Sequence, residues 1–352
     1  NNLDRSIFDV FIISLYDNEK EVQKKISENG ISSQVFGMGL KNKFNLHKYK
    51  YLYKTIRKMK PDIIHVHHTF SGVIGAFFGK IIKKSKIVTT IHNDMRFFNW
   101  YQIFFRTLVM FLSNVIICNS ENTLKSFYAW QDRLIGKRIK RIVYNGIDVK
   151  KILDSNDSDF VEKFIKLGNK DNTPFLICNV GRLVKQKDQE TLIRAYNIFT
   201  KNIKEDSRLI IVGDGPLKGK LNRLIKVLSL SKSIIFTGLL KREQVYKIMN
   251  QSDLFIMSSI FEGFCNAIVE SMVANNPVIA TNINPLPEVI GKDNGIFFNK
   301  GDYKDLSTKM IKLYRDKKLR KELSLKAREY AIENYSLDKC VQNYQNIYLQ
   351  IL

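Results

Sequence analysis

Short apolar runs rich in β-branched residues alternate along this chain with longer stretches whose apolar residues recur at helical spacing. Most of the short runs are almost continuously apolar, which is typical of parallel strands covered on both faces. Because this alternation occurs twice in 352 residues, we predict two α/β domains, each with a doubly wound, Rossmann-like sheet. The predicted strands are 8–14, 63–66, 86–90, 114–118 and 141–144 in the first series, and 175–180, 209–212, 234–237, 254–257, 278–280 and 295–298 in the second.

The boundary between the two domains is predicted in a polar region. Residues 154–159 read DSNDSD, and a second polar segment covers 168–173. We therefore assign residues 1–150 to an N-terminal domain and residues 173–335 to a C-terminal domain. The first strand of a doubly wound domain usually leads into a glycine-rich ligand loop, but no such turn accompanies the first predicted strand here. We expect that the chain either lacks this element or was cut before it.

Glycine-containing turns follow three successive strands of the second series. The carboxyl ends of parallel strands meet at one edge of a sheet, so these turns are predicted to line one crevice, where such folds bind ligands. In the same region Arg182 and Lys187 can hold a diphosphate, Arg182 through forked hydrogen bonds and Lys187 as a point charge. The glycines of the three turns are Gly181, Gly213, Gly215 and Gly238.

The segment FEGFCNAIVE at 261–270 joins a predicted strand to a helix that Pro277 ends. Such a turn offers free backbone N–H groups and the positive end of the helix dipole to an anion. Glu262 in the turn and Glu270 inside the helix can bind neighbouring hydroxyls of one sugar nucleotide. Taken alone, two glutamates eight residues apart are more often solvated surface charges, so the prediction depends on the neighbouring turns.

Together these motifs resemble the donor domain of retaining glycosyltransferases of family 4. The likeness extends over nearly the whole chain and implies the GT-B architecture, in which two Rossmann-like domains face each other. The final segment, about 336–352, is similar to the family's last helix, which crosses back to the first domain. Further matching segments are DIIHVH at 62–67, VTTIHN at 88–93, CNSE at 118–121, VYNGID at 143–148, AREY at 327–330 and NYS at 334–336.

The resemblance also implies a role for each site residue. Arg182 and Lys187 would neutralise the leaving diphosphate, and Glu270 would bind the ribose hydroxyls. Glu262 would hold hydroxyls of the transferred sugar, and His92 would face that sugar from the first domain. The turn that begins at Gly263 would contribute the backbone N–H groups of Phe264, Cys265 and Asn266.

The mechanism implied is a front-side displacement with retention of anomeric configuration, in which the leaving diphosphate accepts the acceptor's proton. No cofactor and no metal are expected. Two departures from the family pattern stand out. Cys265 occupies a position where the family usually has Gly or Pro, so its side chain could narrow the sugar pocket, and the family's N-terminal Gly-Gly loop is absent.

The formal charge of +23 is concentrated toward the front of the chain. Residues 1–170 hold 29 Lys and Arg against 15 Asp and Glu, and residues 41–60 hold eight basic residues and no acidic one. Such a surface suits a polyanion, such as nucleic acid, an anionic membrane or a diphosphate-linked substrate, although a general Lys, Asn and Ile bias would also produce it. No nucleic-acid-binding motif is present, so we expect a nucleotide-sugar donor and a saccharide or lipid-diphosphate-linked acceptor.

The aromatic segment RFFNWYQIFFR at 96–106 permits two interpretations: part of the core, or a helix at the acceptor or at a membrane surface.

The most apolar segment, 103–118, contains Arg106 and is shorter than the ~20 residues of a membrane-spanning helix. No signal peptide precedes the chain, and the four scattered cysteines predict reduced thiols. We therefore expect a cytoplasmic protein, peripheral at the inner face of the membrane if its acceptor is lipid-linked.

Four histidines near predicted strand ends raise the question of a metal site. His65, His67, His68 and His92 come from neighbouring strand ends, but no carboxylate or cysteine has a supporting spacing for a metal. His65 is therefore predicted to be packed and His67 to line a cleft.

The alternatives to a transferase are a GT-B-fold epimerase or phosphorylase, and a non-catalytic or fragmentary sugar-nucleotide-binding protein.

Overall fold

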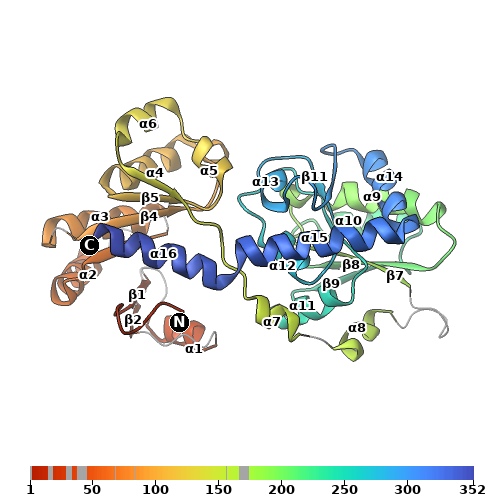
Figure 1. The fold of residues 1–352 in the computed structure, drawn as a ribbon, viewed down its shortest axis with the longest axis horizontal. Helices are drawn as coiled ribbons and strands as arrows, with labels where there is room; N and C mark the ends of the chain where they lie inside the picture. Colours follow the sequence, from red (N-terminus) through yellow and green to blue (C-terminus); the bar gives the residue numbers. More distant parts are fainter. Residues whose placement is uncertain are drawn as a thin grey trace. The chain divides into compact units, whose positions relative to one another are not determined.

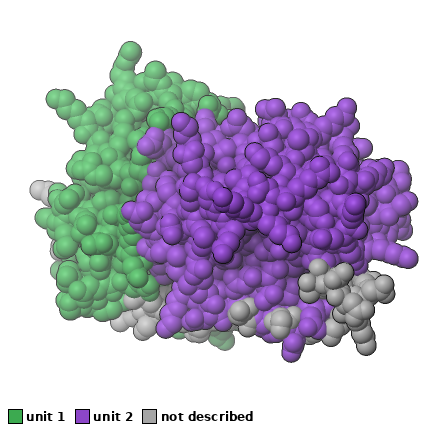
Figure 2. All heavy atoms as spheres, turned by 45° about the vertical axis from the view of Figure 1, so that its right-hand side comes forward, with its two compact units in different colours: residues 1–119, 123–143, 338–352 green, residues 120–122, 144–337 purple. Residues whose placement is uncertain are grey.

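The computed structural model describes residues 2–14, 19–28, 34–37, 46–67, 69–83, 85–155, 157–165 and 174–352. The chain forms two compact units, which Figure 2 distinguishes by colour. Unit 1 comprises residues 1–119, 123–143 and 338–352, and unit 2 comprises residues 120–122 and 144–337. The polar segment predicted at 168–173 lies outside the described residues.

Unit 2 contains a parallel sheet in the order β12-β11-β10-β7-β8-β9. The first strand in sequence therefore lies at the centre, and the chain winds outward from it in both directions. This order confirms the doubly wound fold predicted for the second series and places the switch point between β7 and β10. The strands are β7 (Phe175–Val180), β8 (Ser207–Val212), β9 (Ile234–Gly238), β10 (Leu254–Met257), β11 (Val278–Thr281) and β12 (Ile296–Phe298).

Helices cover both faces of this sheet (Figure 1). On one face Cys178, Ile210 and Phe255 pack with α11, α12 and α15, whereas their neighbours Ile177, Ile211 and Ile256 pack on the other face with α9, α10 and α14. Adjacent residues of each strand are thus buried on opposite sides, which explains the continuous apolar runs. The helices are α7 (Val149–Leu153), α8 (Ser158–Ile165), the 3₁₀ turn η2 (Lys185–Lys187), α9 (Gln189–Lys201), α10 (Lys218–Val227), α11 (Arg242–Asn250), α12 (Asn266–Val273), α13 (Leu286–Ile290), α14 (Tyr303–Arg315) and α15 (Lys317–Tyr335).

Unit 1 contains a parallel sheet in the order β3-β4-β5-β6 and a separate parallel pair, β1 and β2. The strands are β1 (Phe11–Ser14), β2 (Gln34–Gly37), β3 (Ile63–Val66), β4 (Lys86–Ile91), β5 (Val115–Cys118) and β6 (Ile139–Ile142). The helices are α1 (Glu19–Glu28), α2 (Leu46–Met59), α3 (Thr69–Lys83), the 3₁₀ turn η1 (Met95–Phe97), α4 (Trp100–Leu112), α5 (Glu121–Lys125), α6 (Ala129–Ile135) and α16 (Leu337–Ile351).

The C-terminal helix α16, drawn in dark blue in Figure 1, belongs almost entirely to unit 1. Ile347 is buried with Val88, Val115 and Ile117 from the four-stranded sheet, and Tyr344 packs against the same cluster. The chain therefore returns, after completing unit 2, to cover one face of the first sheet.

Two predicted strand boundaries in unit 1 were wrong. The first strand begins at Phe11 rather than residue 8, and its partner β2 was not predicted. The fifth strand covers 139–142 rather than 141–144, because its ladder pairs Ile139 with Val115 and Ile142 with Cys118. Lys140 and Arg141 interrupt the apolar pattern of this edge strand, so the neighbouring run around Val143 misled the prediction.

Among the described residues, no helix combines the length and the apolar character that a bilayer crossing requires. All four cysteines lie in described segments and each is a thiol rather than half of a disulfide.

Candidate active site

The candidate site lies where the carboxyl ends of β7 and β10 meet, at the switch point of unit 2. The loops that follow these two strands are bonded to each other. The backbone N–H of Ile260 donates to the Gln186 carbonyl at 2.8 Å, and the Gln186 side chain donates to the Phe261 carbonyl at 3.0 Å. The Ser258 hydroxyl donates to the Lys187 carbonyl at 2.9 Å. These bonds fix the segment around Lys187 against the segment around Glu262.

Lys187 and Glu262 form a buried ion pair at this edge. Lys187 Nζ lies 2.5 Å from Glu262 Oε1, and the two side chains are only 17% and 7% exposed. The Ser259 hydroxyl donates to the same carboxylate oxygen at 2.6 Å. Burial by itself lowers the pKa of Lys187, but its neighbours, which include the charged Glu262 carboxylate that accepts its hydrogen bond, outweigh burial, so the pKa of Lys187 is raised and the ammonium stays charged.

Two of the glycines predicted at the site, Gly213 and Gly215, are required by close backbone approach. A Cβ on Gly213 would lie 2.1 Å from the Gly181 carbonyl oxygen, and Gly213 has φ +137°. A Cβ on Gly215 would lie 2.5 Å from the Leu183 carbonyl oxygen. At Gly181, the methylene groups of Lys187 pass 3.2–3.3 Å from where a Cβ would stand, so this glycine leaves room for the lysine stem.

Arg182 follows Gly181 at the same sheet edge and is exposed. Its backbone is held because the Gln189 side chain donates to the Arg182 carbonyl at 3.1 Å. In the described part of the chain its guanidinium makes no ion pair with a carboxylate, so it is available to an anion.

Glu270 lies in α12 with its carboxylate already bound to Arg242 of α11. The Tyr246 hydroxyl donates to the same oxygen of Glu270 at 3.4 Å, and the Arg242 guanidinium lies 5.8 Å from the Tyr246 ring centroid. Burial, followed by the charge of Glu270, raises the pKa of Tyr246. Arg242 was not predicted from the sequence. Its position four residues after the third glycine turn, Gly238, indicates that it lies near the site but not that it pairs with Glu270.

The turn before α12 is strained at Cys265, which has φ +73°, in the left-handed region that favours glycine. Burial raises the pKa of its thiol to about 12, so Cys265 is neutral. Phe264 does not face the ion pair, because its ring packs with Tyr144 and Tyr335 at centroid distances of 5.9 and 5.3 Å. The Asn266 side-chain oxygen accepts a hydrogen bond from Asn145 at 2.9 Å.

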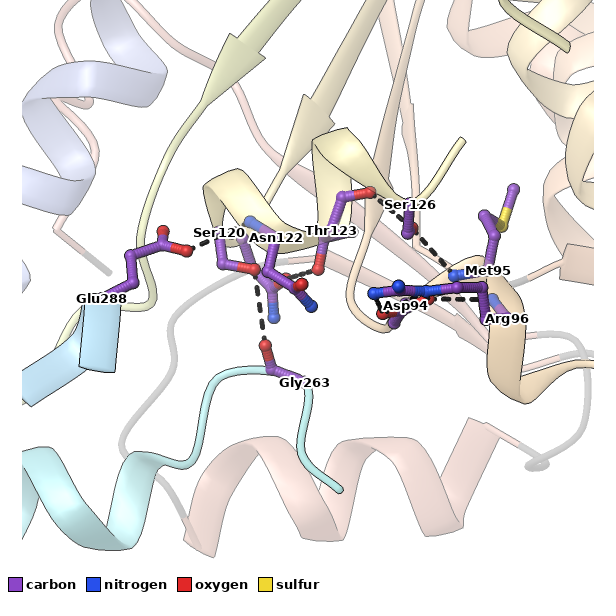
Figure 3. A network of polar contacts seen from close by, with 10 residues as sticks. Asp94, Met95, Arg96, Ser120, Asn122, Thr123, Ser126, Gly263 and Glu288 are labelled. Atoms are coloured by element: carbon purple, nitrogen blue, oxygen red, sulfur yellow. Dashed lines mark hydrogen bonds and ion pairs between the residues drawn. The ribbon is translucent and has the colours of Figure 1, made fainter. Parts of the chain in front are cut away.

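Residues 120–122 are bound to this turn and to α13, as Figure 3 shows. The Ser120 hydroxyl donates to the Gly263 carbonyl at 3.4 Å. The Glu288 carboxylate accepts from the backbone N–H groups of Glu121 at 2.6 Å and of Asn122 at 3.0 Å. All five residues belong to unit 2, so these bonds are part of its framework.

Comparison with known proteins decides which family has this site. The family model "Glycosyltransferase Family 4" matches residues 1–151, and "Glycosyl transferases group 1" matches residues 160–330. The chain is a GT-B glycosyltransferase. The two models together leave only short segments unmatched, in agreement with the resemblance seen in the sequence.

Named relatives of the glycosyltransferase support this assignment. N-acetyl-alpha-D-glucosaminyl L-malate synthase of Bacillus anthracis is 28% identical over 298 residues, which is 83% of this chain and 75% of the relative. UDP-Gal:alpha-D-GlcNAc-diphosphoundecaprenol alpha-1,3-galactosyltransferase of Escherichia coli is 26% identical over 315 residues, which is 86% of this chain and 78% of the relative. The crystal structure of Anabaena HepE with UDP and glucose has a TM-score of 0.80 at 19% identity, over 97% and 92% of the two chains, and confirms the fold.

His92 is the predicted site residue of the glycosyltransferase that belongs to unit 1, where it follows β4. Its Nε2 lies 3.2 Å from His67 Nδ1, and the two rings are stacked. The His67 ring in turn lies 4.2 Å from that of His65. His65 is packed, as predicted: its ring nitrogens lie 2.6 Å from the Tyr348 hydroxyl and 2.7 Å from Thr90 Oγ1.

Among the described residues, no group of three or more His, Cys, Asp and Glu side chains has the arrangement of a metal site. His68, the fourth histidine considered, is outside the described residues. The three rings of His65, His67 and His92 thus lie in a row at the ends of β3 and β4, and His65 joins this row to Tyr348 of α16.

The glycosyltransferase is expected to lose stability in acid through His65. Burial, followed by the positive charges of His67 and His92, lowers the pKa of His65 well below its usual value. The unfolded chain therefore binds more protons than the folded one below pH about 6.5, so the free energy of unfolding should fall by up to about 1.4 kcal/mol per pH unit. Urea unfolding at several pH values would measure this slope. His65→Gln should flatten it, whereas replacing the exposed His47 by Gln should not; equal slopes in all three proteins would contradict the prediction.

Proposed function

We propose that this glycosyltransferase transfers a hexosyl group from a nucleotide-sugar donor, a uridine diphosphate sugar, to a saccharide or lipid-diphosphate-linked saccharide. The observation that carries the proposal is the buried Lys187–Glu262 pair beside the glycine turns at the switch point. In support, HepE has been solved with UDP-glucose, and the Escherichia coli relative is named for UDP-Gal and a diphosphoundecaprenol acceptor. A role in surface polysaccharide or lipopolysaccharide synthesis at a membrane fits such acceptors.

We further propose a retaining, metal-independent reaction. The bond from the anomeric carbon to the diphosphate oxygen breaks, and a bond from that carbon to the acceptor oxygen forms on the same face. The acceptor's proton passes to the leaving diphosphate. Lys187 and Arg182 supply positive charge where negative charge develops, which is the task of a divalent cation in other transferases. Charge stabilisation and positioning then carry most of the rate enhancement.

Each predicted residue has a part in this proposal. Glu262, oriented by Lys187 and Ser259, accepts hydrogen bonds from hydroxyls of the transferred sugar. Glu270, oriented by Arg242 and Tyr246, accepts from the ribose hydroxyls. The turn that ends at Asn266 supplies backbone N–H groups at the start of α12. The resemblance to family 4 supports the role proposed for His92, contact with the transferred sugar.

A thermal-shift titration without divalent metal tests the donor site. UDP at a hundredfold excess over its dissociation constant should stabilise the enzyme by about 2.7 kcal/mol, whereas GDP and ADP at the same concentrations should shift the melting temperature less. Glu270→Gln should remove most of the UDP shift, and Glu329→Gln, at an exposed position on α15, should leave it unchanged. No shift with any nucleotide would contradict the proposal.

Transfer assays test the chemistry. Activity with the matching UDP-sugar should persist in EDTA, and NMR of the product should show the anomeric configuration of the donor. Loss of activity in EDTA that added metal restores would overturn metal independence. A product of inverted configuration would overturn the front-side displacement.

A further inference from the structure

Helix α4 exposes a row of large aromatic side chains. Trp100, Phe104 and Phe111 are 80%, 56% and 42% exposed, although aromatic residues of this size are usually buried. Positions four and eleven residues after Trp100 lie on the same side of a helix, so the three rings form one stripe. Tyr101 beside them is also exposed. The interpretation of segment 96–106 as core is therefore wrong for Trp100, Tyr101 and Phe104. We call the row formed by Trp100, Phe104 and Phe111 the α4 stripe.

The α4 stripe is presented by a well-fixed helix. Val109, on the opposite side of α4, is buried, and so is Met110. Thr107, seven residues after Trp100 and therefore on the stripe side, is buried where the Gln131 side chain of α6 donates to its hydroxyl at 2.6 Å. At its start Asn99 and Gln102 form a reciprocal capping box: the Gln102 N–H donates to Asn99 at 2.9 Å, and the Asn99 N–H donates to Gln102 at 3.3 Å. The exposure of Trp100 in the first turn is thus a property of a capped, packed helix, because a capping box of this kind opposes fraying.

Positive charge gathers at the Phe111 end of the stripe. The Arg138 guanidinium lies 4.6 Å from the Phe111 ring centroid. Lys80 Nζ of α3 donates to Asn114 Oδ1 at 3.2 Å. Partial burial of Lys80, followed by the charges of its neighbours Arg138 and Lys86, lowers its pKa. Lys80 and Lys86 are exposed. Three side chains from α3, β4 and the segment after α6 therefore place cations beside one end of an aromatic row.

The surrounding sequence is strongly basic as well. Residues 69–141 contain twelve Lys and Arg but three Asp and Glu. Of these acids, Asp94 is bound to Arg96, and Asp132 pairs with Lys140 at 2.5 Å. The electrostatic field over this part of unit 1 therefore favours an anionic partner.

We propose that the α4 stripe, together with Lys80, Lys86 and Arg138, docks on the surface of an anionic lipid bilayer. Aromatic rings are preferred at the boundary between headgroups and acyl chains, and neighbouring Lys and Arg are attracted to anionic headgroups. Neither exposed aromatic rings nor basic side chains alone give firm membrane binding, but this surface has both. The choice of a bilayer as partner rests on the proposed function, because a lipid-linked acceptor is reached only at a membrane.

Vesicle sedimentation tests the proposal with the full chain. The protein should sediment with vesicles of phosphatidylcholine and phosphatidylglycerol at low salt, less with phosphatidylcholine alone, and less in high salt. Trp100→Ala/Phe104→Ala should reduce binding by at least about tenfold, since each ring buries apolar surface. Lys80→Gln/Lys86→Gln should reduce binding to the anionic vesicles alone, by about fivefold per charge removed.

Matched controls come from unit 2. Val227 on α10 is 80% exposed and follows the exposed Lys226. Val227→Ser removes an exposed apolar side chain, and Lys226→Gln removes an exposed positive charge, both outside the α4 stripe. These two variants should therefore bind vesicles like the wild type. Melting curves of all variants would show that these surface changes leave the fold intact.

Several outcomes would overturn the docking surface. The first is that the wild-type protein binds neutral and anionic vesicles equally. The second is that the stripe variants bind vesicles like the wild type. The third is that the protein is a dimer, which Trp100→Ala dissociates while vesicle binding stays unchanged. The UDP-induced thermal shift should be the same in wild-type and stripe variants. A lost UDP shift in wild type with normal vesicle binding would instead count against the proposed donor site, so the two failures are distinguishable.

Discussion

Replacing Lys187 by methionine is expected to lower kcat about 100- to 1,000-fold and to destabilise unit 2 by about 3–5 kcal/mol. The rate should fall because Lys187 supplies one of the two positive charges proposed to stabilise the leaving diphosphate. The stability should fall because methionine leaves the Glu262 carboxylate, which is only 7% exposed, without its cation. Transfer assays and urea unfolding measure the two effects separately.

A double variant separates charge pairing from catalysis. Lys187→Met/Glu262→Gln removes both charges, so it should recover much of the stability lost in Lys187→Met, whereas its transfer activity should stay low. The control is Lys185→Met in the same 3₁₀ turn, because Lys185 is exposed and should change neither property strongly. If Lys187→Met and Lys185→Met have the same free energy of unfolding, the Lys187–Glu262 ion pair does not stabilise unit 2.

The parts of the site that the sequence predicted share one property: each follows the end of an apolar strand. Gly181, Gly213 and the turn of Glu262 are fixed by the rule that parallel strands bring their carboxyl ends to one edge, so their proximity follows from strand order alone. Lys187 also lies close to such a strand end. The position of these turns at one sheet edge was predictable because backbone topology, rather than side-chain direction, determines it.

The parts that were missed depend on side-chain direction. Arg242 and Glu270 are 28 residues apart, on two helices whose relative rotation no sequence pattern specifies, so their ion pair could not be foreseen. Trp100 and Phe104 are of residue types common in cores, and only the packing of α4 through Val109 and Met110 shows that these two aromatic side chains are exposed. The edge strand β6 was misplaced for a related reason, because its charged residues conceal a strand that needs burial on one side only.

Gly213→Ala is expected to destabilise unit 2 by about 2–6 kcal/mol and to weaken UDP binding severely. Its φ of +137° strains any residue with a side chain. In addition, the new Cβ would stand 2.1 Å from the Gly181 carbonyl oxygen, a backbone atom that cannot move without displacing the turn that carries Arg182. Urea unfolding and the UDP thermal shift would measure the two effects.

Gly219 supplies the matched control. It lies in α10, where a Cβ would meet nothing within 4 Å, so Gly219→Ala should raise stability by about 0.5–1 kcal/mol and leave UDP binding unchanged. Two identical substitutions six residues apart should therefore have opposite effects on stability.

The effect of Gly213→Ala should spread because the three glycine turns are bonded to one another. The Gly181 N–H donates to the Val212 carbonyl at 2.9 Å, and the Gly213 N–H donates to the Gly238 carbonyl at 3.0 Å. A shift at Gly213 therefore strains the turns after β7, β8 and β9 together. Wild-type UDP affinity in a folded Gly213→Ala protein would mean that these turns do not form the donor site. A loss of UDP affinity in the fraction of the protein that remains folded would instead show that the donor site depends on the shared geometry of the three turns.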